Sequence, residues 1–128
     1  MSELKKSNIK SIGILLGTND MSQSIGLQRF KENLSELIDR IKTANPLIDV
    51  FLISPSGNNL TRPLTMKDYD EALHELSVKE NISYVSLYKN MGTFEEQNAR
   101  GLFEDDVHPN TDGGYQIANV IYDRLMTI

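Results

Sequence analysis

Three side chains in this sequence have the types and spacing needed for acyl transfer. Asp105 lies three residues before His108, and in a tight loop this spacing lets the carboxylate reach one imidazole nitrogen. A neutral imidazole held in this way can take up a proton near pH 7. The side-chain amide of Asn19 can donate a hydrogen bond to a developing oxyanion. We interpret His108 as a candidate base, Asp105 as the residue that orients it, and Asn19 as an oxyanion donor.

These residues need strands and helices to position them. The apolar residues 12–16 predict a strand buried on both faces, as in parallel sheets, and Gly17 ends it. Residues 48–53 predict a second strand. Residues 82–87 predict a third strand, more polar than the others, which suits a sheet edge.

Helical patterns separate and follow these strands. Residues 24–44 carry an apolar stripe at helical spacing, and Pro46 stops that helix. Thr65 can cap a second helix with Asp68 in a capping box. Residues 88–104 are expected to be a long connection with one helical turn. Thr111 or Asp112 is expected to cap a final helix, whose buried stripe is Ile117, Ala118, Ile121 and Leu125.

The order of elements predicts a single α/β domain over residues 1–128. Crossovers of about thirty residues are typical of parallel βαβ units. Because such crossovers are right-handed, sequential strands would place both crossover helices on one face and leave the last helix on the other. Ligands bind beyond the carboxyl ends of parallel strands, so both motifs should face one crevice. The apolar first strand would form an open edge, and we expect a second copy, another subunit or an N-terminal segment to cover it.

The two motifs resemble sequence blocks of the SGNH (GDSL-type) hydrolases, which are esterases and deacetylases. Gly17-Thr18-Asn19-Asp20 resembles the block that supplies an oxyanion asparagine, and Asp105-Asp106-Val107-His108 resembles the block that supplies the carboxylate and base of the triad. The resemblance implies a three-layer, flavodoxin-like parallel sheet of about five strands, of which this chain matches the last three. It also implies an acyl or acetyl ester substrate, on carbohydrate or small lipid-like molecules, and no cofactor or metal. We expect Gly17, Thr18 and Pro109 to contact that substrate.

The block that carries the nucleophilic serine of this family is not visible in the sequence. Ser54 and Ser56 follow the second strand, where the family has no nucleophile, and Ser7 and Ser11 precede the first strand. Two hypotheses remain open. The chain is the C-terminal portion of an esterase, inactive alone and completed by a companion chain or segment that supplies the serine. Alternatively, it is a non-catalytic binding or assembly module derived from such a hydrolase.

Composition narrows the remaining classes of function and kinds of site. The 128 residues contain no cysteine, which excludes a disulfide framework, a zinc-thiolate site and a cysteine nucleophile. The net charge of -5 argues against nucleic acid as a partner. We found no stretch typical of a signal peptide or membrane span, and we expect a cytoplasmic protein without membrane contact. Tyr115 and Tyr122 are expected to pack in the final helix, and His74 to face solvent.

Overall fold

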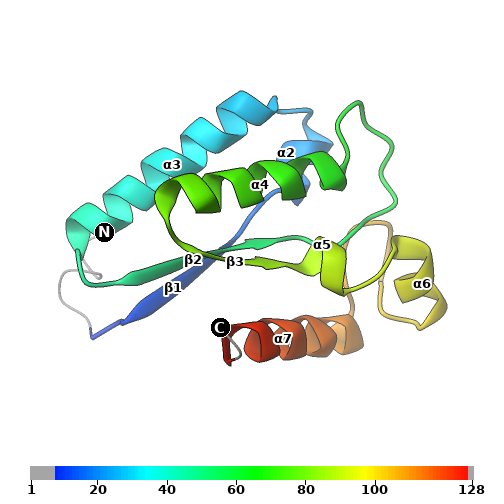
Figure 1. The fold of residues 1–128 in the computed structure, drawn as a ribbon. Coiled ribbons are helices and arrows are strands. Elements are labelled where there is room, and N and C mark those ends of the chain that lie inside the picture. The colour runs from blue at the N-terminus through cyan, green and yellow to red at the C-terminus, as the bar shows by residue number, and fades with distance from the viewer. Residues whose placement is uncertain (1–7, 127–128) are drawn as a thin grey trace.

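The computed structural model describes residues 8–126 and consists of a parallel sheet with helices on both faces (Figure 1). Its strands are β1 (Ser11–Leu15), β2 (Asp49–Ser54) and β3 (Ser83–Ser86). Its helices are α2 (Thr18–Ser22), α3 (Leu27–Ala44), α4 (Met66–Glu80), α5 (Leu87–Asn90), α6 (Phe94–Ala99) and α7 (Thr111–Met126). Within the described residues, no helix is both long and apolar enough to cross a membrane.

The sheet has the predicted sequential topology. Its order is β1-β2-β3, and both pairings are parallel, with Ile14 opposite Leu52 and Leu52 opposite Tyr84. Helices α3 and α4 cover one face, and α7 lies on the other (Figure 1). The expected three-layer α/β architecture is therefore confirmed. The carboxyl ends of all three strands point to the same side of the molecule, where the predicted motifs begin.

The main hydrophobic core lies between the sheet and the pair α3 and α4. The predicted stripe of α3 is buried through Phe30, Leu34, Ile38 and Ile41. The ring of Phe30 meets that of Tyr69 edge to face, with centroids 5.0 Å apart, a favoured geometry for aromatic pairs. The capping box of α4 is also confirmed.

A buried polar network fixes the carboxyl ends of β2 and β3. The Asp70 carboxylate accepts hydrogen bonds from the Tyr84 hydroxyl and, at 2.6 Å, from Ser86 Oγ. Burial and the bond to Asp70 raise the pKa of Tyr84 well above its ordinary range. Ser54 Oγ accepts the Tyr88 backbone N–H at 3.2 Å. Because β2 ends in this network, the loop after it leaves the sheet from a fixed point.

The prediction that the first strand is buried on both faces is wrong. Ile14 is buried under α3 and α4, but Leu15, which points to the opposite face, is 44% exposed. On that face the Phe51 ring lies so close to Gly13 that an added Cβ would sit 2.5 Å from it. On that face α7 packs around Phe51, Ile53 and Val85 of β2 and β3, and Leu15 is not part of that cluster. Within the described residues, β1 pairs only with β2, so its other edge is open.

The final helix also differs from its prediction in its cap and in the residues that it buries. Asn110, and not Thr111 or Asp112, caps α7, because its Oδ1 accepts the Gly113 N–H at 2.9 Å. Tyr115 and Tyr122 are 67% and 64% exposed, so they do not pack as expected. The predicted stripe residue Ala118 is exposed as well, and Val120 packs toward the sheet with Ile117, Ile121 and Leu125. The connection before α7 is more helical than expected, since it contains α5 and α6.

Candidate active site

The first arm of the site is the turn from β1 into α2. Gly17 precedes the helix with a φ of 146°, a conformation that glycine adopts without steric penalty. Met21 is buried and holds the short helix against the core. Asn19 therefore stands at the carboxyl end of β1 with an exposed side chain. No hydrogen bond to that side chain forms within residues 8–126, so its amide is available to a ligand.

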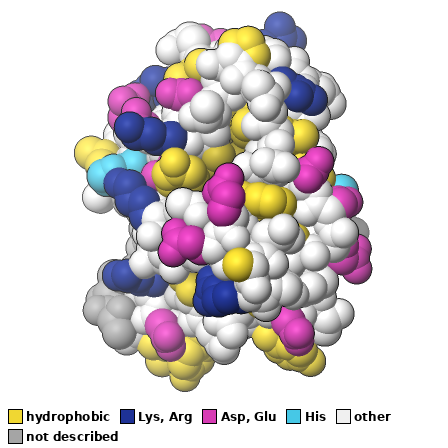
Figure 2. All heavy atoms as spheres, turned by 90° about the vertical axis from the view of Figure 1, so that its right-hand side faces the viewer, with side chains coloured by type: hydrophobic (Ala, Val, Ile, Leu, Met, Phe, Trp, Pro, Cys, Tyr) yellow, Lys and Arg dark blue, Asp and Glu magenta, His cyan; other side chains and the backbone are white. Residues whose placement is uncertain are grey.

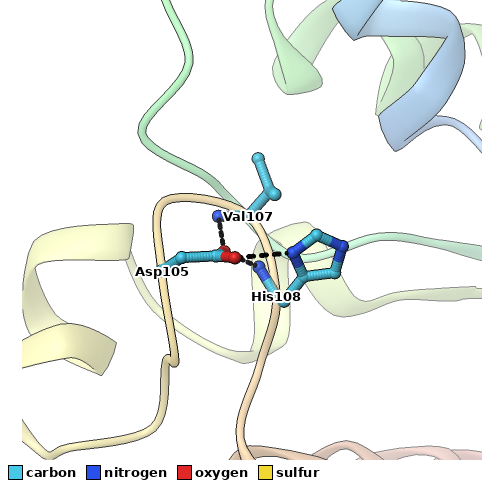
Figure 3. A network of polar contacts seen from close by, with 3 residues as sticks. All are labelled: Asp105, Val107 and His108. Atoms are coloured by element: carbon cyan, nitrogen blue, oxygen red, sulfur yellow. Dashed lines mark hydrogen bonds and ion pairs between the residues drawn. The ribbon is translucent and has the colours of Figure 1, made fainter.

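The second arm is the loop that carries Asp105 and His108 (Figure 3). Asp105 Oδ1 accepts the backbone N–H groups of Val107 at 2.8 Å and His108 at 2.6 Å. Asp105 Oδ2 lies 2.8 Å from His108 Nδ1. The backbone N–H groups of Val107 and then His108, together with the imidazole, lower the pKa of Asp105 to about 2. The carboxylate is thus charged at neutral pH and holds both the loop and the ring.

Three further contacts anchor this loop at the start of α7. The Glu104 N–H donates to the His108 carbonyl at 2.8 Å, and the Asn110 N–H donates to the Leu102 carbonyl at 2.9 Å. Gly113 packs against the Leu102 carbonyl so closely that an added Cβ would lie 2.3 Å from the oxygen. The neighbouring Gly114 has no such contact, so the close backbone approach is specific to Gly113. These contacts hold the loop against the first turn of α7.

The geometry of the pair suits a general base. An imidazole that donates its Nδ1 proton to a carboxylate presents the lone pair of Nε2 for proton transfer. The His108 side chain is 71% exposed, and its second ring nitrogen points away from Asp105 (Figure 3). Within the described residues, no serine or threonine hydroxyl is hydrogen-bonded to His108. The pair is thus arranged as a candidate base with a candidate orienting carboxylate.

The two arms meet in one cleft of about 500 Å³ at the carboxyl ends of the strands. It is lined by Asn19 and His108, and also by Gly17, Thr18 and Pro109. Asp105 stands outside this lining, on the far side of the imidazole. The face of the molecule that carries these strand ends mixes apolar, acidic and basic side chains (Figure 2). Five of the six predicted site residues therefore line the same cavity, and the sixth, Asp105, contacts it through His108.

A groove of similar volume, about 470 Å³, lies between the outer surfaces of α3 and α4. Its lining includes the exposed ion pair of Lys31 and Glu75 and none of the predicted site residues. Exposed ion pairs contribute little to stability or binding. We therefore place the candidate site in the cleft at the strand ends and not in this groove.

The sequence did not lead us to predict that the loop after β2 lines the cleft. Pro55, Ser56 and Leu60 line it, and Ser56 is only 8% exposed. Ser54 is fully buried in the polar network beneath β2 and does not reach the cleft. The position of this loop at the carboxyl end of a central parallel strand was the available signal. Ser11 lies at the opposite, amino end of β1, and Ser7 lies outside the described residues.

Comparisons with known proteins extend this description. Residues 4–117 match the GDSL-like Lipase/Acylhydrolase family. No curated protein matches the sequence. Among solved structures, a protein from Lactobacillus plantarum is similar with a TM-score of 0.82 and 21% identity, over 94% of this chain and 68% of that protein.

Two further similar structures are esterases by their descriptions. An acetyl xylan esterase gives a TM-score of 0.75 at 17% identity, over 90% of this chain and 66% of the esterase. A carbohydrate esterase family 3 protein from Talaromyces cellulolyticus gives 0.78 at 18% identity, over 97% of this chain and 60% of that protein. At this level of identity the likeness establishes a shared fold. The 128 residues span about two thirds of the length of these proteins.

Proposed function

The chain belongs to the GDSL-like lipase/acylhydrolase family, and on this premise we propose that it provides most of the active site of a serine-type carboxylic ester hydrolase. The observation that carries the proposal is that Asn19 and the Asp105–His108 pair border one cleft. His108 is the general base and acid, Asp105 orients it, and Asn19 donates to the oxyanion. The nucleophilic serine comes from outside these 128 residues.

The proposed reaction is a two-step acyl transfer. The serine oxygen attacks the ester carbonyl carbon while His108 Nε2 takes its proton, and the carbonyl oxygen becomes an oxyanion that accepts from Asn19 Nδ2. The tetrahedral intermediate collapses to an acyl-serine, and His108 gives the proton to the departing alcohol oxygen. Water then attacks the acyl-serine by the same route and releases the acid. Gly17, Thr18 and Pro109 hold the substrate against this machinery.

The open edge of β1 is the proposed place for the serine-bearing segment. A strand that paired parallel to β1 would end beside Gly17, so a serine just after it would enter the cleft. Leu15 and Leu16, 44% and 46% exposed, flank that position and would be covered by such a segment. The segment can belong to a companion chain, or a second copy of this chain can cover the edge in a homo-oligomer.

The proposed substrates are acyl or acetyl esters. Support comes from the descriptions of two similar structures, an acetyl xylan esterase and a carbohydrate esterase. The cleft lining combines apolar groups such as Leu60 and Ile117 with the amide of Asn19. A mixed lining of this kind suits a small acyl group attached to a polar alcohol.

The experiment measures p-nitrophenyl acetate hydrolysis by the chain alone and after addition of polypeptides that carry a strand followed by a Gly-Asp-Ser motif. We expect little activity alone and a gain on addition, abolished in His108→Ala and retained in His74→Ala. His74 is the matched control because it is the second histidine and is exposed on α4. A gain that survives His108→Ala would contradict the proposal.

A non-catalytic binding or assembly module is the second candidate. It is favoured by the absence, among the described residues, of a hydroxyl bonded to His108, and by exposed apolar groups on β1 and α7. This candidate predicts ester or carbohydrate binding without turnover under every complementation condition. Turnover by the chain that requires His108 would exclude it.

A further inference from the structure

The two arms of the site are not hydrogen-bonded to each other. Within the described residues, no hydrogen bond joins residues 17–23 to residues 104–110. Their side chains must nevertheless keep a fixed separation if Asn19 and His108 are to act on one carbonyl group, because an ångström of misplacement reduces the rate strongly. Something else in the molecule must set that separation.

The segment of residues 57–64, which we call the strap, touches both arms. On the side of the histidine loop, the Asn59 N–H donates to the Asp106 carbonyl at 2.9 Å. Asn59 Nδ2 donates to Asp106 Oδ1 at 3.2 Å. Two bonds to one residue fix both the position and the orientation of the loop between Asp105 and Val107.

On the opposite side the strap holds the end of α2. Arg62 Nε donates to the Ser22 carbonyl at 2.9 Å, and Asn58 Nδ2 contacts Met21 Sδ at 3.4 Å. A charged donor on a helix carboxyl end gains from both the hydrogen bond and the helix dipole. Asn19 lies one turn earlier in the same helix.

The strap is itself held by hydrogen bonds, so it can fix the position of one arm relative to the other. The Asn58 side chain accepts the Leu60 N–H at 3.0 Å, which closes a local turn. Leu60 then lines the cleft between the two arms. The strap begins three residues after the buried end of β2. It ends just before the capping box of α4, where the Thr65 N–H donates to Asp68 at 2.7 Å.

We propose that the strap is a positioning device that couples the Asn19 arm to the Asp105–His108 arm, with Asn59 and Arg62 as its two positioning residues. Its catalytic meaning rests on the proposed function, but its mechanical role does not. Asn59 is exposed, so its bonds to Asp106 add little to global stability. Their main effect falls on the loop that holds the histidine.

The test is amide hydrogen exchange and carboxyl NMR titration on the chain alone, for Asn59→Ala, Arg62→Gln and the control Asn45→Ala. Asn45 is also an asparagine with a side-chain hydrogen bond, in which its Oδ1 accepts the Leu47 N–H at 3.3 Å, but it follows α3 at the end of the sheet where β2 begins. In Asn59→Ala we expect exchange at Val107 and His108 to rise roughly threefold to tenfold, as for loss of one hydrogen bond. In the same variant the Asp105 titration midpoint should move up from about 2 toward its ordinary value.

The other variants complete the test. Arg62→Gln should raise exchange at Gln23 and Ile25, whose N–H groups bond to Asn19 and Asp20, and Asn45→Ala should leave both arms unchanged. Unchanged Val107 and His108 exchange in Asn59→Ala, or an equal rise in Asn45→Ala, would overturn the proposal. These readouts need no turnover, so failed complementation refutes the proposed function alone. In a complemented enzyme, Asn59→Ala should lower kcat more than it changes KM.

Discussion

The two faces of the sheet are built very differently. The face under α3 and α4 holds a cluster of fourteen buried residues among those described, whereas the face over α7 holds four, with other apolar groups only partly buried. The catalytic candidates sit at the strand ends, and His108 is carried by the loop that leads into α7. Buried apolar packing is thus concentrated on one face, while the candidate site depends on the more open one. Loops that bind ligands are commonly found at such less stable regions.

The largest expected effect comes from deleting the same side chain on each face. Ile38 is fully buried on α3, so Ile38→Ala should lower the free energy of unfolding by about 3 kcal/mol. Ile121 on α7 is only partly buried, and Ile121→Ala should cost roughly half as much. Urea unfolding monitored by circular dichroism measures both. Equal costs would contradict the contrast between the faces.

A second pair of variants tests the one tightly packed point on the α7 face. Gly113→Ala forces a Cβ to within 2.3 Å of the Leu102 carbonyl and should destabilise the chain by about 1–3 kcal/mol. Gly114→Ala meets no atom within 4 Å and should be neutral or stabilising by up to about 1 kcal/mol. Urea unfolding should therefore show a loss of stability in Gly113→Ala and no loss in Gly114→Ala. If Gly113→Ala is neutral, the anchoring of the histidine loop on α7 is wrong.

The stability of the histidine loop on the more open face should depend on pH. The folded pKa of Asp105, about 2, lies below its ordinary value of 3.8. The contribution of its ionised form is therefore complete above the ordinary value and is lost as the pH falls through the folded value. The difference in thermal midpoint between the unmodified chain and Asp105→Asn should be constant from pH 5 to pH 7. It should shrink as the pH is lowered toward about 2. A difference that grew on acidification would contradict this assignment.

The smallest effect is expected at the exposed side of α7. Tyr122 is 64% exposed, so Tyr122→Ser should change the free energy of unfolding by less than about 0.5 kcal/mol. If the open side of the molecule is covered in an oligomer, the same substitution should weaken association. Light scattering at several concentrations measures this. A stable monomer in both the chain and the variant, without binding of a hydrophobic dye, would contradict the expected oligomer.

The sequence alone determined most of the framework, because its signals are local. Apolar periodicity defined α3, and the Thr65–Asp68 pair marked the start of α4, since these patterns act within one or two turns. The handedness of parallel crossovers then set which helices share a face. The spacing of Asp105 and His108 predicted their contact for the same local reason.

Only the tertiary structure decided the features that depend on distant neighbours. The exposure of Leu15, Tyr115 and Tyr122 follows from where α7 packs, which no local pattern encodes. The cap at Asn110 was decided by the turn that precedes α7, and the strap bonds of Asn59 and Arg62 join residues about forty or more positions apart. The types of side chain therefore indicated the chemistry. The convergence of both arms on one cleft arises from packing between segments that lie far apart in the sequence.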